Sequence, residues 1–146
     1  MKRTCLLALL LCAGLISRAQ KASLNHIALS VTDLQQSTRF YRDVIGLDTI
    51  PEPFHDGKHT WFRVGPKAHL HLIQGGDAPT EHPKNTHLCF SVASVPEFLL
   101  VLQKHGITYE NWAGEKNAVT TRVDGVKQVY FKDPNGYWIE INDARE

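Results

Sequence analysis

The chain has few cysteines: only Cys5, Cys12 and Cys89 occur among its 146 residues. The first two lie in an N-terminal segment that we expect to be removed, so Cys89 would have no partner for an internal disulfide. This excludes a disulfide-stapled scaffold. The fold must then be stabilised by its apolar core, to which a bound metal could add.

Long apolar runs and an excess of one charge are also missing. No run approaches the roughly 20 apolar residues that a transmembrane helix needs, and the net charge is only +1. Without a basic surplus, nucleic acid and anionic membranes are not expected partners. We predict one globular domain with no membrane span.

Residues 1–19 have the pattern of a secretory signal peptide. Two basic residues precede the apolar run Cys5–Leu11, and a small-x-small cleavage site ends at Ala19. Cleavage there would remove three basic residues and change the net charge from +1 to −2. We therefore expect export, to the periplasm or outside the cell. An uncleaved anchor and a lipoprotein attached at Cys12 remain as alternatives, although Leu11 stands where a lipoprotein would have a small residue.

Histidine, in contrast, is abundant, with eight in the chain. Several of the histidines lie at matching positions of two similar stretches, which indicates an internal duplication. The stretch that begins at His26 (HIALSV) is echoed by the one that begins at His87 (HLCFSV), and His71 matches Glu140 in the same way. We predict a single domain over residues 20–146, built from two modules at about 24–74 and 86–143.

Each module has the pattern β-α-β-β-β. Asp33 is a predicted helix N-cap and Gly46 a predicted C-cap, and the second helix begins at Ser94 and ends near residue 105. The predicted fold is α+β, with two tandem βαβββ modules that form a curled mixed sheet around a metal cavity. The first helix is predicted over 34–45, and the strands over 24–31, 47–50, 59–64, 68–74, 87–92, 107–111, 119–123, 126–132 and 137–142.

Strand periodicity indicates which side chains share a face. Ile27 and Leu29 must meet the helix, so His26 points to the opposite side of its strand. The same parity places His71, His87 and Glu140 on the helix-free faces. Polar residues on such a face often only point to solvent. Here, however, possible ligands occupy equivalent positions of the two modules in both pairs, His26 with His87 and His71 with Glu140, which favours metal binding. Three imidazoles and a carboxylate suit Zn, Ni, Mn or Fe(II).

Four further residues are predicted to bind substrate: Trp61, Arg63, Arg122 and Gln128. Either arginine could hold a substrate carboxylate or phosphate through a bidentate contact. For Arg122 a solvated strand charge is an equal alternative. Cys89 shares the face of His87, and we expect it to be a small buried side chain.

Four sequence stretches carry a family resemblance: Leu24–Ala28, Phe40–Asp43 with Gly46-Leu47, Thr86–Leu88 and Asp133–Ile141. They resemble the vicinal oxygen chelate superfamily, which includes glyoxalase I, fosfomycin resistance proteins, methylmalonyl-CoA epimerase, bleomycin resistance proteins and extradiol dioxygenases. The segment Arg122–Val129 is similar to the glyoxalase I-like, lactoylglutathione lyase-related branch.

The resemblance implies that His26, His87 and Glu140 bind a divalent metal, which chelates two neighbouring substrate oxygens as a Lewis acid. Glu140 is also the predicted catalytic proton carrier. His71 stands where glyoxalases and epimerases commonly have Glu or Gln, so the chain departs there from the glyoxalase I pattern.

The expected function is therefore a metal-dependent, glyoxalase-like lyase or isomerase acting on a small oxygenated substrate. The alternatives are an extradiol-type dioxygenase, a fosfomycin-type thiol transferase and a metal-free ligand-sequestering resistance protein. A homodimer is expected, and the cavity could form within one chain or between two.

Overall fold

The structure is a computed structural model that describes residues 21–75 and 81–145. The predicted signal peptide and its Cys12 alternative lie outside these residues. No helix in the described ranges is long and apolar enough to cross a membrane.

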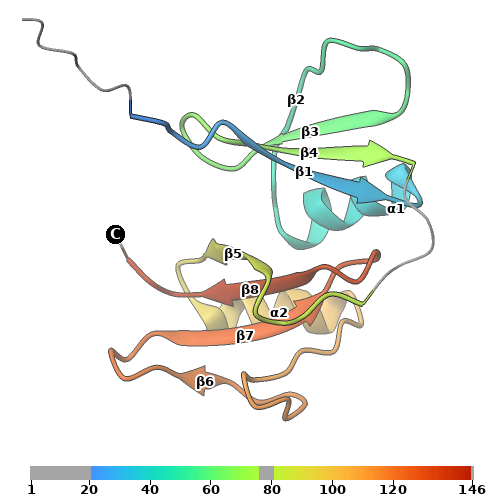
Figure 1. The fold of residues 1–146 in the computed structure, drawn as a ribbon. Helices are drawn as coiled ribbons and strands as arrows, with labels where there is room; N and C mark the ends of the chain where they lie inside the picture. Colours follow the sequence, from blue (N-terminus) through green and yellow to red (C-terminus); the bar gives the residue numbers. More distant parts are fainter. Residues whose placement is uncertain (1–20, 76–80, 146) are drawn as a thin grey trace, which may run out of the picture.

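Two similar modules follow one another along the chain (Figure 1). Each forms a four-stranded sheet, in the orders β1-β4-β3-β2 and β5-β8-β7-β6, with parallel first pairs and antiparallel remaining pairs. The first module contains β1 (His26–Val31), α1 (Leu34–Arg39), the π-helical turn η1 (Phe40–Val44), β2 (Thr49–Ile50), β3 (His59–Arg63) and β4 (His69–Gln74). The second contains β5 (His87–Ser91), α2 (Val95–Lys104), β6 (Thr120–Thr121), β7 (Lys127–Lys132) and β8 (Trp138–Asn142). The predicted α+β class and tandem modules are confirmed, but the two sheets do not close into one.

Both helices begin where their capping residues predict. Asp33 accepts a hydrogen bond from the Gln36 amide at 2.8 Å, and Ser94 accepts one from Glu97 at 3.3 Å. The first helix widens into a π-helical turn at its end, where the Ile45 amide donates to the Phe40 carbonyl at 3.3 Å. Gly46, with a φ of 84°, then ends it as predicted.

The predicted strand 107–111 is wrong. In this segment only Glu110 forms β-bridges, to Lys116 and Tyr130. The reason is a local turn: the Asn111 side chain accepts from the Glu115 amide at 2.9 Å and donates to the Glu115 carboxylate at 2.6 Å. These side-chain bonds compete with a strand ladder.

The helix α1 lies between the first sheet and the second module (Figure 1). The ring centroids of Phe40 and Phe131 are 6.3 Å apart. Both side chains belong to one apolar core to which both modules contribute residues. The Tyr41 hydroxyl donates to Asp133 at 2.9 Å across the same contact. Because the helix side of the first sheet packs inward, its helix-free face points away from the second module.

Candidate metal centre

The helix-free face of the first sheet carries a stack of aromatic rings. The His71 ring lies between those of His26 and Trp61, at centroid distances of 4.3 and 3.9 Å and with nearly parallel planes. Strand pairing explains the stack, since Trp61 lies directly opposite His71 and Ala28 flanks it on the other side. The predicted face of His26 and His71 is confirmed. We call His26 and His71 the first half-site.

His71 has the properties of a neutral imidazole ligand. It is only 8% exposed, and its buried Nε2 has no hydrogen-bond partner among the described residues. Buried polar atoms almost always have one, so this nitrogen is left free for another ligand. Burial, and then the neighbouring His26, His69 and His59, lower the pKa of His71. A neutral imidazole is the form that binds metal.

On the second sheet, Glu140 lies at the centre of a polar cluster. One of its oxygens, Oε2, accepts from the Tyr130 hydroxyl at 2.8 Å and lies 3.1 Å from His87 Nε2. The other, Oε1, accepts from Asn142 Nδ2 at 2.9 Å and from Cys89 Sγ at 3.4 Å. We call His87 and Glu140 the second half-site.

The cluster keeps Glu140 ionised. Burial alone would raise its pKa, but the hydrogen bonds from Asn142, Tyr130 and Cys89, with the charge of His87, outweigh it and the pKa of Glu140 is lowered. Burial and the Glu140 carboxylate raise the pKa of Tyr130, so this hydroxyl remains a donor. A buried, ionised carboxylate beside an imidazole is suited to bind a cation or to accept a proton.

The two half-sites do not meet within one chain. Across residues 21–75 and 81–145, no three His, Cys, Asp or Glu side chains gather closely enough to hold a metal ion. Each half-site offers two donors of the type that Zn, Ni, Mn and Fe(II) accept, so the donor types fit such a metal. Among the described residues, however, one chain does not bring more than two of the four donors together. Of the two arrangements that the sequence left open, the described residues of one chain do not form the centre alone.

The four predicted substrate-binding residues lie in different surroundings. Trp61 belongs to the ring stack, and Arg63 is exposed on the same face of β3. Gln128 is buried and donates to the Tyr130 hydroxyl at 2.6 Å, so it is connected to Glu140 through Tyr130. Arg122 pairs with Asp124 at 2.5 Å in the turn after β6. Their substrate-binding roles stay predictions.

Tyr130 and Asn142 contact Glu140 but are not among the site residues that the sequence predicted. Both lie on the same strand face as Glu140 and donate directly to its carboxylate. Their sequence signal was strand parity: Tyr130 pairs directly with Glu140, and Asn142 is two residues further along β8. Parity applied to uncharged side chains would have found them.

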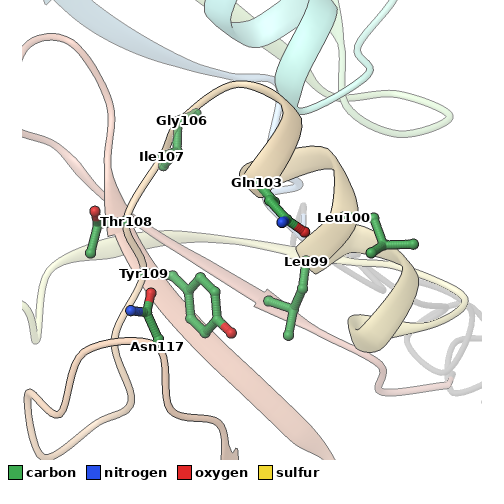
Figure 2. A pocket seen from close by; sticks show the side chains of 8 residues that line it. All are labelled: Leu99, Leu100, Gln103, Gly106, Ile107, Thr108, Tyr109 and Asn117. Atoms are coloured by element: carbon green, nitrogen blue, oxygen red, sulfur yellow. The ribbon is translucent and has the colours of Figure 1, made fainter.

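Two hollows in the structure differ in whether they border a residue of a half-site. A cavity of about 450 Å³ lies between α2 and the segment that follows it, and its lining carries no histidine, cysteine or carboxylate (Figure 2). A smaller hollow of about 260 Å³ lies between β1 and β5 and borders His87 and Cys89. Of these two hollows, only the one between β1 and β5 borders a residue of a half-site.

Cys89 is exposed, contrary to the expectation of a buried side chain. Partial burial of its sulfur and the Glu140 carboxylate nevertheless raise the pKa of the Cys89 thiol to about 12. Because the thiolate is the nucleophile, we expect iodoacetamide to alkylate Cys89 much more slowly at pH 7.5 than a small free thiol. Glu140→Gln removes the nearby negative charge and should increase the alkylation rate, measured by mass spectrometry. An unchanged rate in that variant would contradict the assigned cause.

Comparisons with known proteins identify the family of the chain. Residues 23–141 match the family model of the Glyoxalase/Bleomycin resistance protein/Dioxygenase superfamily. Glyoxylase I 4 from Arabidopsis thaliana is 27% identical over 125 residues, which cover 82% of this chain and 69% of the relative. Mitochondrial methylmalonyl-CoA epimerase from Mus musculus is 32% identical over 132 residues, covering 83% and 72%.

A similar solved structure is that of a glyoxalase/dioxygenase from Nostoc punctiforme. It superposes with a TM-score of 0.69 at 25% identity, covering 85% of this chain and 92% of that one. The match to the family model extends through both modules and includes His26, His71, His87 and all but the last residue of β8. The chain belongs to the glyoxalase/bleomycin resistance protein/dioxygenase superfamily.

Proposed function

We propose that the protein is a metal-dependent lyase or isomerase of the glyoxalase type, acting on a small substrate with two neighbouring oxygens. The observation that carries the proposal is Glu140, an ionised and buried carboxylate 3.1 Å from His87 Nε2. A carboxylate held in this way can accept a proton from the carbon next to a carbonyl and return it to the same or a neighbouring carbon.

The residues that would hold the metal are His26 and His71 from one half-site and His87 and Glu140 from the other. A bound divalent metal would supply Lewis-acid polarisation of the substrate oxygens. The chain itself supplies the proton carrier. Tyr130 and Asn142 donate to Glu140 and fix the orientation of the carboxylate, while Trp61 offers a flat apolar surface beside His71.

We further propose that the two half-sites combine across a homodimer. Among the described residues one chain brings no more than two donors together, and the helix-free face of the first sheet points away from the second module. A two-fold symmetric dimer would pair the first half-site of each copy with the second half-site of the other, giving two equal centres. The protein's own copy is then both partner and source of ligands.

Metal analysis of the protein with a variant series tests the proposal. After supplementation and desalting, about one metal per chain is expected in the wild type. His26→Ala, His87→Ala and Glu140→Ala should each lose it, and His71→Ala decides between three and four ligands. If the wild type retains no metal and His87→Ala changes nothing, a metal-free sequestering protein is the correct function.

One observation favours a second candidate. His26, His87 and Glu140 form a two-histidine, one-carboxylate set, which suits Fe(II) with open positions for oxygen. An extradiol-type dioxygenase would consume oxygen when Fe(II)-loaded protein is mixed with catechol, whereas a lyase or isomerase would not. A fosfomycin-type thiol transferase would instead consume a thiol in the presence of fosfomycin.

A further inference from the structure

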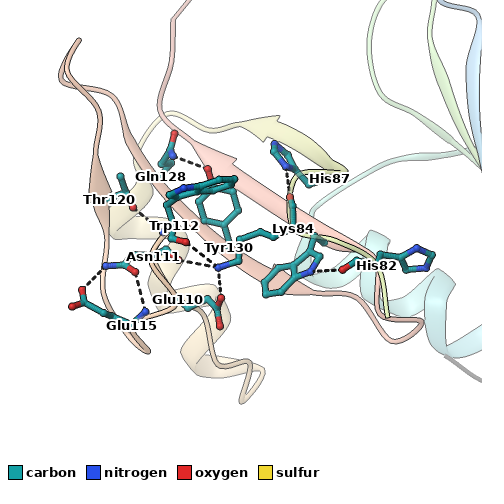
Figure 3. Close-up of polar contacts among 11 residues, drawn as sticks. His82, Lys84, His87, Glu110, Asn111, Trp112, Glu115, Thr120, Gln128 and Tyr130 are labelled. Atoms are coloured by element: carbon teal, nitrogen blue, oxygen red, sulfur yellow. Dashed lines mark hydrogen bonds and ion pairs between the residues drawn. The ribbon is translucent and has the colours of Figure 1, made fainter. Parts of the chain in front are cut away.

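Lys84, in the linker between the modules, has a side chain that is held by five contacts. Lys84 Nζ forms an ion pair with Glu110 and donates to the carbonyls of Asn111 and Trp112 at 3.2 and 3.3 Å (Figure 3). It also lies 4.8 Å from the ring centroid of Trp138 and 5.6 Å from that of Tyr130. We call these contacts the Lys84 anchor. Cation–π contacts of this kind gain strength as the ammonium loses water, and the Lys84 side chain is only 18% exposed.

The anchor holds a short turn just before β5. The Thr86 amide donates to the Pro83 carbonyl at 2.9 Å, so Lys84 lies inside the turn. The Trp138 indole donates to the His82 carbonyl at 2.9 Å and ties the same segment to β8. The turn is therefore fixed against the sheet that carries the second half-site.

The turn contacts a proposed ligand directly. The Lys84 carbonyl lies 2.8 Å from His87 Nδ1. A carbonyl oxygen can only accept, so Nδ1 carries a proton, and Nε2 is the ring atom directed at Glu140. The hydrogen bond of one imidazole nitrogen sets the tautomer and orientation of the other.

We propose that Lys84 is a positioning residue: its anchored side chain fixes the carbonyl that orients His87 with Nε2 toward Glu140. Glu110, the ion-pair partner of Lys84, also forms a β-bridge with Tyr130. Lys84 therefore connects this bridge to His87 on β5. The hydrogen bond between His87 Nδ1 and the Lys84 carbonyl is inferred from the observed contacts and does not depend on a bound metal. Its consequence for metal binding rests on the proposed function.

Lys84→Met tests the proposal, because it keeps the apolar stem and removes the ammonium. In metal-free protein, the Nδ1–H of His87 should be seen by ¹H–¹⁵N NMR as a protected, slowly exchanging proton. It should be lost in Lys84→Met and retained in Lys84→Arg. Lys132→Met is the matched control, since Lys132 Nζ also lies over the Trp138 ring, at 5.0 Å, but belongs to β7. Glu110→Gln is a second variant that leaves the lysine in place and should give a partial loss.

Metal titration of the same variants adds a second readout. Residues that orient a ligand typically change metal affinity by about 10–100-fold, so Lys84→Met should weaken zinc binding about tenfold and Lys132→Met should not. A protected His87 Nδ1–H that persists in Lys84→Met would overturn the proposal. Loss of that proton with unchanged zinc affinity would support the role of Lys84 and instead overturn the assignment of His87 as a ligand.

Discussion

Glu140→Gln is expected to abolish proton transfer while leaving the fold intact. Glutamine keeps one oxygen at the same place but cannot accept a proton, and general acid–base catalysis by such a group contributes about 10²–10⁴-fold. The measurement is deuterium uptake from D₂O at the carbon next to the carbonyl of hydroxyacetone, with zinc-, nickel- or manganese-loaded protein. We expect the rate to fall about 10³-fold.

The control for this variant is Gln128→Ala. Gln128 reaches Glu140 only through the Tyr130 hydroxyl, so its removal should disturb the carboxylate orientation without removing the base. The exchange rate should then fall by no more than about tenfold. If Glu140→Gln exchanges deuterium as fast as the wild type, another group carries the proton and Glu140 is at most a ligand.

Asp133→Ala is expected to cause the largest loss of stability. Asp133 is 5% exposed and accepts three hydrogen bonds, from the Tyr41 hydroxyl at 2.9 Å and from the amides of Asn135 and Tyr137 at 2.8 and 2.9 Å. Alanine would leave all three donors unsatisfied at the contact between modules. At about 1–3 kcal/mol for each buried unsatisfied group, we expect the free energy of unfolding to fall by about 3–5 kcal/mol.

Urea denaturation followed by tryptophan fluorescence and circular dichroism measures this loss. Asp143→Ala is the matched control, because Asp143 is less buried and accepts one bond, from the Lys127 amide at 2.7 Å. Its cost should be about 1 kcal/mol. Equal effects of the two substitutions would mean that the contact from Tyr41 to Asp133 does not hold the modules together.

Strand parity predicted the composition of both half-sites because it depends only on local geometry. An alternating strand must place His26 opposite Ile27, and His87 opposite Leu88, whatever the rest of the chain does. The contacts confirm the shared faces, since His26 stacks on His71 and His87 lies beside Glu140. Local capping rules likewise located both helix starts at Asp33 and Ser94.

The relation between the two sheets could not be obtained in this way. Parity identifies the face of a strand but not the direction in which that face points in the folded chain. Here that direction is set by long-range contacts, such as the Thr32 amide to Asn135 at 2.9 Å and Asn135 to Ser37 at 2.8 Å. The contacts of the Lys84 side chain were hidden for the same reason, since its side-chain partners are at least 26 residues away along the chain.

Complementation between two inactive variants tests the composite centre most directly. His26→Ala damages only the first half-site and Glu140→Gln only the second. In a mixed dimer of these variants one centre would combine both defects, and the other would combine the intact His26 and His71 of one copy with the intact His87 and Glu140 of its partner. Random mixing makes about half of the dimers mixed, each with one of two centres restored. The account therefore predicts that unfolding and refolding an equal mixture restores about a quarter of the wild-type deuterium exchange. If the mixture stays as inactive as either variant alone although mixed dimers form, the centre does not combine residues of two chains.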